Sequence, residues 1–398
     1  MDQIKTQFPI FANHPGLVYL DSAATTQTPS VVIDAMNDYY TKTRSNVHRG
    51  IYDLSEQATA AYEAARTSLA KFLNADREEI IFTAGTTHGL NLLAYSLTPK
   101  MSHRDNVVLT RLEHHANMVP WQEMAKHYGF TIRYIELTAE GELDIASAEK
   151  VIDANTKIAS FAFVSNVLGT VAPVKKICAL AHARRALTIV DAAQSVAHLP
   201  TDVRDLDCDF LVLSGHKLYG PTGIGALYGK KMLLEECLEP FFYGGDMIKT
   251  VSYTGAAWAD LPSRFEAGTQ NIAGVIGFGA AAEWFMNLGW EKITTHERKI
   301  VSYALEKLTP LVAVTGATDP NKRTGLVAFT IPGIHPHDIA EILNQDNICI
   351  RVGFHCAEPL HRHLGIGPTA RASFGVYTTK EDIDRLATEI EKVKTIFA

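Results

Sequence analysis

The stretch LVLSGHKLYGPTG, from Leu211 to Gly223, decides how the rest of the sequence is interpreted. Apolar residues beginning at Phe210 lead into a Ser-Gly-His-Lys sequence that ends at Lys217, which predicts a buried parallel strand opening into a loop. Ligands bind at that end of the strands in open α/β sheets. A lysine held there among apolar neighbours loses hydration, so its pKa falls and its neutral amine can form a Schiff base. A surface lysine packed on a loop is the commoner alternative, so the surrounding sequence has to decide.

The composition is that of an ordinary globular enzyme. The chain has 398 residues, of which 46% are hydrophobic and 20% charged, and a prior of about 150 residues per domain predicts two or three domains. A net charge of −7 offers no electrostatic basis for binding nucleic acid or an anionic membrane. The sequence shows no apolar run of about 18 residues and no apolar signal core. Five cysteines without a Cys-x-x-Cys pair favour a reducing, cytoplasmic location.

From Ile80 to Gly229, short apolar runs alternate with amphipathic stretches. This βαβα rhythm predicts an α/β fold with a mainly parallel sheet covered by helices on both faces. Two earlier stretches, 30–40 and 57–73, carry apolar residues at helical spacing.

The pattern changes beyond residue 280. Helices are predicted over 280–287, 296–308 and 380–397, with strand-like runs GLVAFTI and ICIRV between them. We therefore expect a large α/β domain over 21–275 and a smaller C-terminal α+β domain over 276–398. Residues 1–20 are expected to associate with the smaller domain.

Polar residues follow several of the predicted strands. Thr86 and Thr87 stand between the strand IIFTA and a helix, where free backbone N–H groups and hydroxyls favour a phosphate. An ordinary helix cap is the alternative. Asn166 follows the strand KIASFAFV and can hydrogen-bond a ring substituent or simply form a turn.

Adjacent histidines, His114 and His115, follow the strand NVVLT. A metal-binding pair on a helix is usually spaced i, i+4, and neighbouring side chains point apart. One imidazole can therefore stack on a planar cofactor or move a proton, whereas two structural histidines are the alternative.

Asp191 ends the apolar strand LTIV. A buried carboxylate needs a partner, and a protonated pyridine nitrogen is one; a helix N-cap is the simpler alternative. Pyridoxal phosphate requires a phosphate-binding site, an imidazole that stacks on its ring, an acid and a Schiff-base lysine. The sequence predicts all four at the strand ends of one sheet.

These motifs carry a family resemblance over nearly the whole chain. The chain resembles the pyridoxal-phosphate enzymes of fold type I in the class V aminotransferase superfamily, and more closely the SufS-type cysteine desulfurases and selenocysteine lyases. The matching text is LDSAATTQ, NVHRG, GTTHGLN, LEHHANMVPW, SNVLGT, VDAAQS, SGHKLYGPTGIG, RFEAGT, RVGFHC and ARASFGVY.

The resemblance implies a role for each candidate residue. Lys217 is the Schiff-base lysine, Asp191 pairs with the pyridine nitrogen, and His114 stacks on the ring. Arg371 binds the substrate carboxylate, a task suited to a guanidinium because it makes two parallel hydrogen bonds. The residues that match cofactor-binding positions are Thr86, Thr87, Asn166, Gln194, Ser214, His216 and Thr269. Asn166 also lies near the substrate in the family, and Thr269 reaches the phosphate of the neighbouring subunit, which implies a homodimer.

The segment NVHRG, residues 46–50, has no regular period. On spacing alone a polar connecting loop is favoured over a basic loop that reaches an active site. The second interpretation makes His48 and Arg49 candidate substrate-binding residues.

Cys356 lies in the Gly-rich, non-periodic stretch RVGFHCAEPLHRHLGIG. It can be a small buried hydrophobe, a ligand in a metal site with His355, His361 and His363, or a nucleophile on a mobile loop. The histidine spacing matches no familiar zinc set, so no metal is expected. The resemblance places the persulfide-forming cysteine at this position.

The function implied by the resemblance is conversion of L-cysteine to L-alanine with transfer of sulfur to Cys356. The persulfide then supplies iron–sulfur cluster assembly through an acceptor protein of the SufE or SufU type. Selenocysteine lyase, another class V aminotransferase or an epimerase are alternatives of the same fold. A metal-binding or sulfur-carrier module without catalysis is the alternative from a different class.

Three residues depart from the family pattern. Phe354 stands where relatives often carry His, Gln270 where they usually have Pro, and His88 where Glu is frequent. The family pattern therefore does not predict how protons move in the cysteine loop, how rigid the loop near Thr269 is, or how the subunits communicate.

Overall fold

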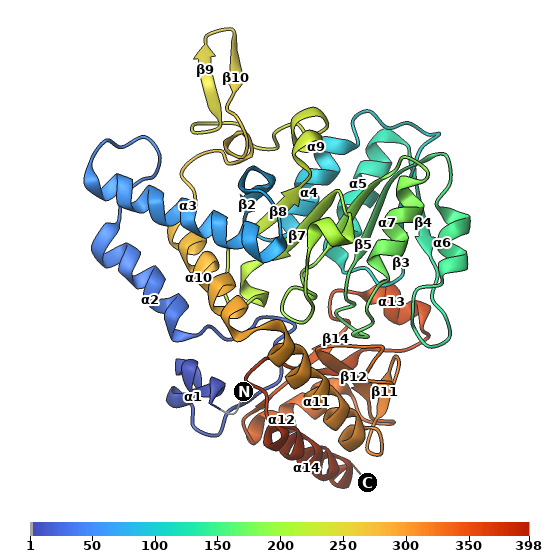
Figure 1. The fold of residues 1–398 in the computed structure, drawn as a ribbon. Helices are drawn as coiled ribbons and strands as arrows, with labels where there is room; N and C mark the ends of the chain where they lie inside the picture. The colour runs from blue at the N-terminus through green and yellow to red at the C-terminus, as the bar shows by residue number, and fades with distance from the viewer. Residues whose placement is uncertain (1–2, 398) are drawn as a thin grey trace.

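The computed structural model describes residues 3–397, and a seven-stranded sheet forms its centre (Figure 1). The strand order is β2-β8-β7-β6-β5-β3-β4. Strand β8 is antiparallel to β2 and β7, and the other neighbours are parallel, so the predicted mainly parallel sheet is confirmed. The strands are β2 (Ile80–Thr83), β3 (Asn106–Thr110), β4 (Thr131–Ile135), β5 (Thr156–Ala162), β6 (Leu187–Asp191), β7 (Phe210–Ser214) and β8 (Gly225–Gly229).

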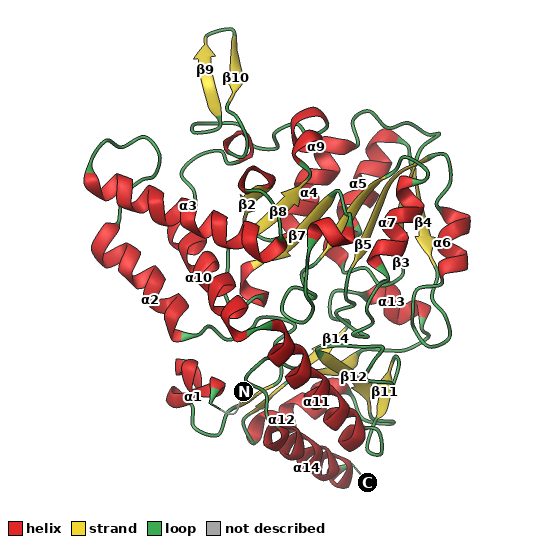
Figure 2. Ribbon diagram, in the orientation of Figure 1, coloured by secondary structure: helices red, strands yellow, loops and turns green. Residues whose placement is uncertain are grey.

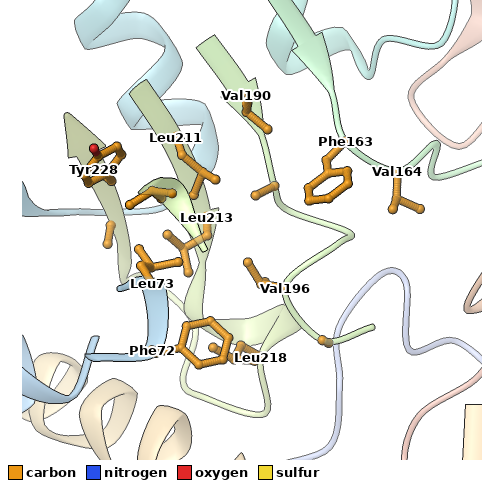
Figure 3. Close-up of a cluster of buried hydrophobic side chains, with 14 of the residues drawn as sticks. Phe72, Leu73, Phe163, Val164, Val190, Val196, Leu211, Leu213, Leu218 and Tyr228 are labelled. Carbon is orange, nitrogen blue, oxygen red and sulfur yellow. The ribbon is translucent and has the colours of Figure 1, made fainter. Parts of the chain in front are cut away.

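Helices cover both faces of this sheet (Figure 2). They are α3 (Asp53–Leu73), α4 (Thr86–Leu97), α5 (Val119–Tyr128), α6 (Ile145–Val151), α7 (Val174–His182), α8 (Val203–Leu206), α9 (Lys231–Glu236) and α10 (Ile272–Leu288). Helix α2 (Ser30–Asp38) packs on α10 instead. Because side chains alternate along a strand, Phe210 and Val212 of β7 enter the core under α4 and α5, whereas Leu211 and Leu213 enter the core with α3 and α10. Figure 3 shows the core on the α3 and α10 side of the sheet, around Leu211 and Leu213. Burial on both faces explains the unbroken apolar run.

Helices α3 and α10 lie side by side (Figure 1). A Cβ atom at Gly279 would lie 2.4 Å from the Cβ of Ala65, so the close approach of the two helices requires glycine there. Residues of α10 as far as Phe285 belong to the same core as α3. The expected domain boundary at residues 275 and 276 falls inside α10, and the division into 1–20, 21–275 and 276–398 stays a prediction.

A second sheet, wholly antiparallel, lies at the C-terminal end in the order β11-β12-β15-β14. Its strands are β11 (Ala313–Thr315), β12 (Leu326–Thr330), β14 (Arg351–Gly353) and β15 (Thr369–Ser373). The helices in this part are α11 (Trp290–Leu308), α12 (Pro336–Gln345), α13 (Glu358–His363) and α14 (Lys380–Ile396). Near the N-terminus, α1 (Pro9–Asn13) precedes β1 (Val18–Tyr19), which pairs in parallel with β13 (Ile348–Cys349).

A hairpin of β9 (Ile248–Ser252) and β10 (Gly255–Trp258) projects from the body of the molecule (Figure 1). Its tip residue Tyr253 is fully exposed, and Val251 is exposed on β9. Among the helices of residues 3–397, none alone is long and apolar enough to cross a membrane, although α10 and α11 reach that length and composition together, with an 81° bend between them.

A buried ion pair anchors the segment that follows the hairpin to the main sheet. Arg66 on α3 is 2% exposed, and its two terminal nitrogens donate to Glu266 at 2.8 and 2.9 Å. The carboxylate of Glu266 also accepts hydrogen bonds from the Phe82 backbone N–H and from the Tyr62 hydroxyl. Every donor around this carboxylate is itself buried, so the pair compensates for its own desolvation only while it is complete.

We expect Glu266→Ala to lower the free energy of unfolding by about 3–5 kcal/mol, because buried Arg66 keeps only the half-buried Glu63 as an ionic partner and the buried Phe82 N–H and Tyr62 hydroxyl lose their acceptor. Denaturant titration of the purified protein measures this loss. Glu123→Ala removes an exposed partner of Lys126 and serves as the matched control, with a loss of at most about 1 kcal/mol. Equal losses in the two variants would contradict a stabilising role for the buried pair.

Candidate active site

The carboxyl ends of β2, β3, β5, β6 and β7 meet at one edge of the main sheet, because β8 alone runs in the opposite direction. A cavity of about 460 Å³ opens at this edge and is closed on the other side by residues of the second sheet. It brings together the following residues that the sequence singled out: Thr86, Thr87, His114, Asn166, Asp191, Gln194, Ser214, His216, Lys217, Cys356 and Arg371. Residues up to 285 positions apart in the sequence therefore share one site.

Three predicted residues lie outside this cavity. His48 contacts Glu63, with 3.2 Å between Nε2 and Oε1, and Arg49 pairs with Asp246 at 3.3 Å. Thr269 is exposed in the loop after Glu266. Within a single chain, these residues do not join the others.

Lys217 ends the one-turn 3₁₀ helix that follows β7. Thr26 positions this turn, because its N–H donates to the His216 carbonyl at 2.9 Å and its hydroxyl accepts from the Tyr219 N–H at 2.8 Å. Burial lowers the pKa of Lys217 to about 8; Asp191 opposes this effect and Arg371 adds to it. The neutral amine is therefore far more populated near neutral pH than in a lysine with the ordinary pKa of 10.5, and this neutral form is what nucleophilic attack on a carbonyl requires.

Asp191 is 5% exposed at the end of β6, and one carboxylate oxygen accepts from the Ala193 N–H at 2.9 Å. Burial raises its pKa, so a cation placed beside this carboxylate would gain a strong partner.

His114 lines the cavity, and its Nδ1 accepts a hydrogen bond from the Ala116 N–H at 3.0 Å. Burial, with a smaller effect of Lys217, lowers the pKa of His114 to about 4. The ring is neutral near pH 7 with its proton on Nε2, so it can lie against a planar group as a neutral donor.

The start of α4 forms a narrow cradle with the end of β7. Gly85 has a φ of 145°, a conformation that favours glycine, and a Cβ at Gly225 would lie 2.6 Å from the Gly85 Cα. The Thr86 N–H and hydroxyl both lie 2.8 Å from the Ser214 hydroxyl. Hydroxyls and the N-terminal end of a twelve-residue helix thus face the cavity together, as an anionic group requires.

Cys356 is exposed on a loop between β14 and α13 and lines the cavity. His355 and Cys356 have φ values of 50° and 55°, so two successive non-glycine residues adopt the left-handed conformation. The Cys356 carbonyl accepts from the His115 N–H at 2.7 Å, and the His115 ring accepts from the Glu358 N–H. His114 thus enters the cavity while His115 holds the cysteine loop.

Several buried polar atoms of the described residues have no hydrogen-bond partner, and three of them belong to this cavity: Asn166 Oδ1, His355 Nδ1 and Arg371 Nε. Buried polar groups without partners are unusual, and their concentration here indicates a ligand that supplies both donors and acceptors. Together with the Lys217 amine, the Asp191 carboxylate and the hydroxyl cradle, this set fits pyridoxal phosphate carrying an amino acid.

The sequence missed Asp21 and Arg351 as parts of the site, and it considered His355 only as a possible metal ligand beside Cys356. Arg351 and His355 line the cavity, and Asp21 contacts Arg351 at 2.9 Å. The available signal was their place in LDSAATT and RVGFHC, the motifs that supply Thr26 and Cys356. Burial lowers the pKa of His355 to about 2, so this ring is neutral.

The three departures from the family pattern have clear local contacts. The Phe354 ring packs edge-on against His361 at 5.4 Å. Gln270 donates to the carbonyls of Ala267 and Gly268, which holds the loop without a proline. His88 accepts from the Ala84 N–H and lies against the Phe242 ring.

Among residues 3–397, no group of three or more His, Cys, Asp or Glu side chains is arranged to hold a metal ion. His361 of the cysteine loop instead lies close to the Ala357 carbonyl and the Thr369 hydroxyl.

In the cofactor-free protein, we expect acetylation of Lys217 to show a midpoint near pH 8, whereas an exposed lysine follows the ordinary value of 10.5. The neutral amine is the reactive form, so labelling rises as pH passes the pKa. Asp191→Asn should move the midpoint lower, because it removes an anion that stabilises the ammonium; Arg371→Gln should move it higher. Mass spectrometry of labelling across pH gives each midpoint. A Lys217 midpoint at the ordinary lysine value of 10.5 would exclude the proposed desolvation.

The family model for class-V aminotransferases matches residues 18–386. The chain is 48% identical to a "Probable cysteine desulfurase" of Halalkalibacterium halodurans, covering 99% of this chain and 98% of that protein. The apo structure of a cysteine desulfurase from Thermococcus onnurineus superposes with a TM-score of 0.95 at 40% identity, covering 99% and 98% of the two chains. The Escherichia coli cysteine desulfurase CsdA superposes with a TM-score of 0.91 at 36% identity, again covering 99% and 98%. This chain therefore belongs to the class-V aminotransferase family, among its pyridoxal-phosphate-dependent cysteine desulfurases.

Proposed function

We propose that this chain takes sulfur from L-cysteine, releases L-alanine and holds the sulfur as a persulfide on Cys356. The proposal depends on one observation: Cys356, Lys217 and Arg371 line a single cavity, and the Nε of Arg371 has no hydrogen-bond partner there. An aminotransferase or an epimerase needs the amine and the guanidinium but has no use for the thiol.

We assign the substrate carboxylate to Arg371. Its Nη1 donates to the Asn166 carbonyl at 2.8 Å, which holds the guanidinium still, and its Nε remains free to donate. Asn166 Oδ1 also lacks a partner and can accept a hydrogen bond from the substrate or the cofactor.

Pyridoxal phosphate, when bound, supplies an electron sink for the substrate α-carbon. Thr86, Thr87, Gln194, Ser214 and His216 would hold its phosphate or ring hydroxyl, Asp191 would face the pyridine nitrogen, and His114 would lie against the ring. Lys217 carries the lowered pKa that a base for the α-proton requires.

Cys356 then completes the sulfur transfer. Its thiolate forms an S–S bond with the substrate sulfur while the substrate C–S bond breaks, and the electron pair of that bond returns to the substrate carbon skeleton. Protonation of that skeleton gives L-alanine, so the balance is cysteine plus thiol in, alanine plus persulfide out. An exposed, strained loop suits this task, because the thiol has to meet the substrate and then a second protein.

We further propose a homodimer in which Thr269 reaches the phosphate site of the partner subunit. Thr269 is exposed and lies outside the cavity of its own chain, and Glu266, three residues before it, anchors this loop through the ion pair with Arg66. His48 and Arg49 lie outside the cavity of their own chain as well. If they contact substrate, they do so in the cavity of the partner subunit of the proposed homodimer.

The persulfide requires an acceptor, for which we propose a protein of the SufE or SufU type in the cytoplasm, with iron–sulfur cluster assembly as the destination. Selenocysteine is a second substrate consistent with the same groups, because its selenium leaves more readily than sulfur.

We expect Cys356→Ala to bind pyridoxal phosphate and L-cysteine normally but to lose alanine formation by several powers of ten, because losing a covalent nucleophile has that typical effect. Visible absorbance during cysteine titration measures binding, and paired assays of sulfide and alanine measure turnover. Lys217→Ala is the control that loses cofactor absorbance as well as turnover. Alanine formation by Cys356→Ala at the parent rate would favour an aminotransferase-like reaction instead.

Shared active sites predict complementation between variants. Lys217→Ala and Thr269→Val chains, each weak alone, should regain activity when refolded together, because one site of the mixed dimer receives both native residues. Activity at limiting pyridoxal phosphate, measured beside unmixed samples, gives the result. A fully active monomer in light scattering would be incompatible with this arrangement.

A further inference from the structure

Arg351 and Arg371 face each other directly across the strand pair β14 and β15. Like charges opposite one another in a sheet are destabilising, and both side chains line the cavity. Arg371 is 2% exposed, which makes its charge difficult to stabilise with water. This pair of cations therefore requires anions from elsewhere in the structure.

Asp21 supplies one of these anions. Its carboxylate accepts from Arg351 Nε at 3.1 Å and from Arg351 Nη2 at 2.9 Å, which forms a two-pronged pair. Its contact with Arg371 Nη2 is longer, at 3.4 Å. A backbone bridge between Asp21 and Ser373 fixes this residue against β15, the strand that carries Arg371.

The contacts of Arg371 leave one edge of its guanidinium incomplete. Nη1 is used by the Asn166 carbonyl, Nη2 meets Asp21 only at 3.4 Å, and the buried Nε has no partner. Nε and Nη2 form the edge that takes a carboxylate through two parallel hydrogen bonds. Burial and the Asn166 contact already orient Arg371, so the main effect of Asp21 on it is electrostatic.

We propose that Asp21 acts as an internal carboxylate that competes with the substrate carboxylate for the Nε–Nη2 edge of Arg371, while Arg351 holds Asp21 beside the cavity. The proposal rests on the assignment of the substrate carboxylate to Arg371. Two guanidiniums and one internal carboxylate leave a single net positive charge, which matches a monocarboxylate such as L-cysteine.

Asp21 weakens carboxylate binding for substrate and product alike, because L-cysteine and L-alanine carry the same α-carboxylate. Its presence therefore favours release of L-alanine after each sulfur transfer. The effect belongs to ground-state binding and leaves the chemical step itself unchanged.

Propionate, the desamino form of L-alanine, tests the proposal because it presents the carboxylate without an amine. Its affinity is measured by calorimetry in the cofactor-free protein and as competitive inhibition against L-cysteine in the holoenzyme. We expect Asp21→Asn to bind propionate about 10-fold more tightly, the size expected from removing one nearby like charge at intermediate dielectric, and to lower KM with kcat nearly unchanged. Asp21→Glu keeps the charge and should resemble the parent. Glu341→Gln, which removes an exposed charge on α12, is the matched control and should change nothing.

Arg351→Gln provides a second, opposite test. It leaves Asp21 with Arg371 as its sole cation, so propionate binding should weaken several-fold, and this variant serves if Asp21→Asn does not fold. Unchanged or weaker propionate binding in folded Asp21→Asn, beside an Arg371→Gln variant that does lose propionate, would overturn the competition. Undiminished propionate binding in Arg371→Gln would instead refute the assignment of the carboxylate to Arg371, and the competition with it.

Discussion

The shared direction of strands β3, β5, β6 and β7 places their carboxyl ends at one edge of the sheet, and the cavity depends on this constraint. These strands are buried almost throughout, and the polar groups that face the cavity come from residues at or just after the strand ends. The loop after each strand therefore delivers one chemical group: an imidazole, an amide, a carboxylate and an amine. The same apolar surroundings that stabilise the strands remove water from Lys217 and lower its pKa.

Cys356, Arg351 and Arg371 belong to the second sheet and the loop after β14, so cofactor binding and sulfur transfer are assigned to different parts of the fold. The rigid main sheet carries the groups suited to holding a cofactor, whereas Cys356 lies on an exposed loop after β14. Contacts from His115 and Asn166 to the backbone of that loop connect the two parts. A thiol that must meet both a substrate and an acceptor benefits from a loop that is tethered but exposed.

The N-terminal segment connects both sheets through a few residues. Thr26 fixes the turn that carries Lys217, Gln194 donates to the Ala23 carbonyl, and Asp21 pairs with Arg351 and Arg371. The electrostatic state of the carboxylate site therefore depends on a segment some 330 residues away from Arg351 in the sequence. Little water screens the pair of Asp21 and Arg371, whereas the half-exposed Arg351 is partly screened.

The sequence by itself determined the alternating strands and helices, and it placed Thr86, His114, Asp191 and Lys217 at strand ends, because apolar periodicity reports burial directly. The family motifs added Cys356 and Arg371, which no period could have distinguished. Only the tertiary structure decided that β8 runs antiparallel and that Asp21 lies between two arginines. Strand direction and charge pairing depend on contacts between residues far apart in the sequence, and the pattern of a single segment does not predict these contacts. Likewise, His48, Arg49 and Thr269 lie outside the cavity of their own chain, a placement that depends on the fold as a whole.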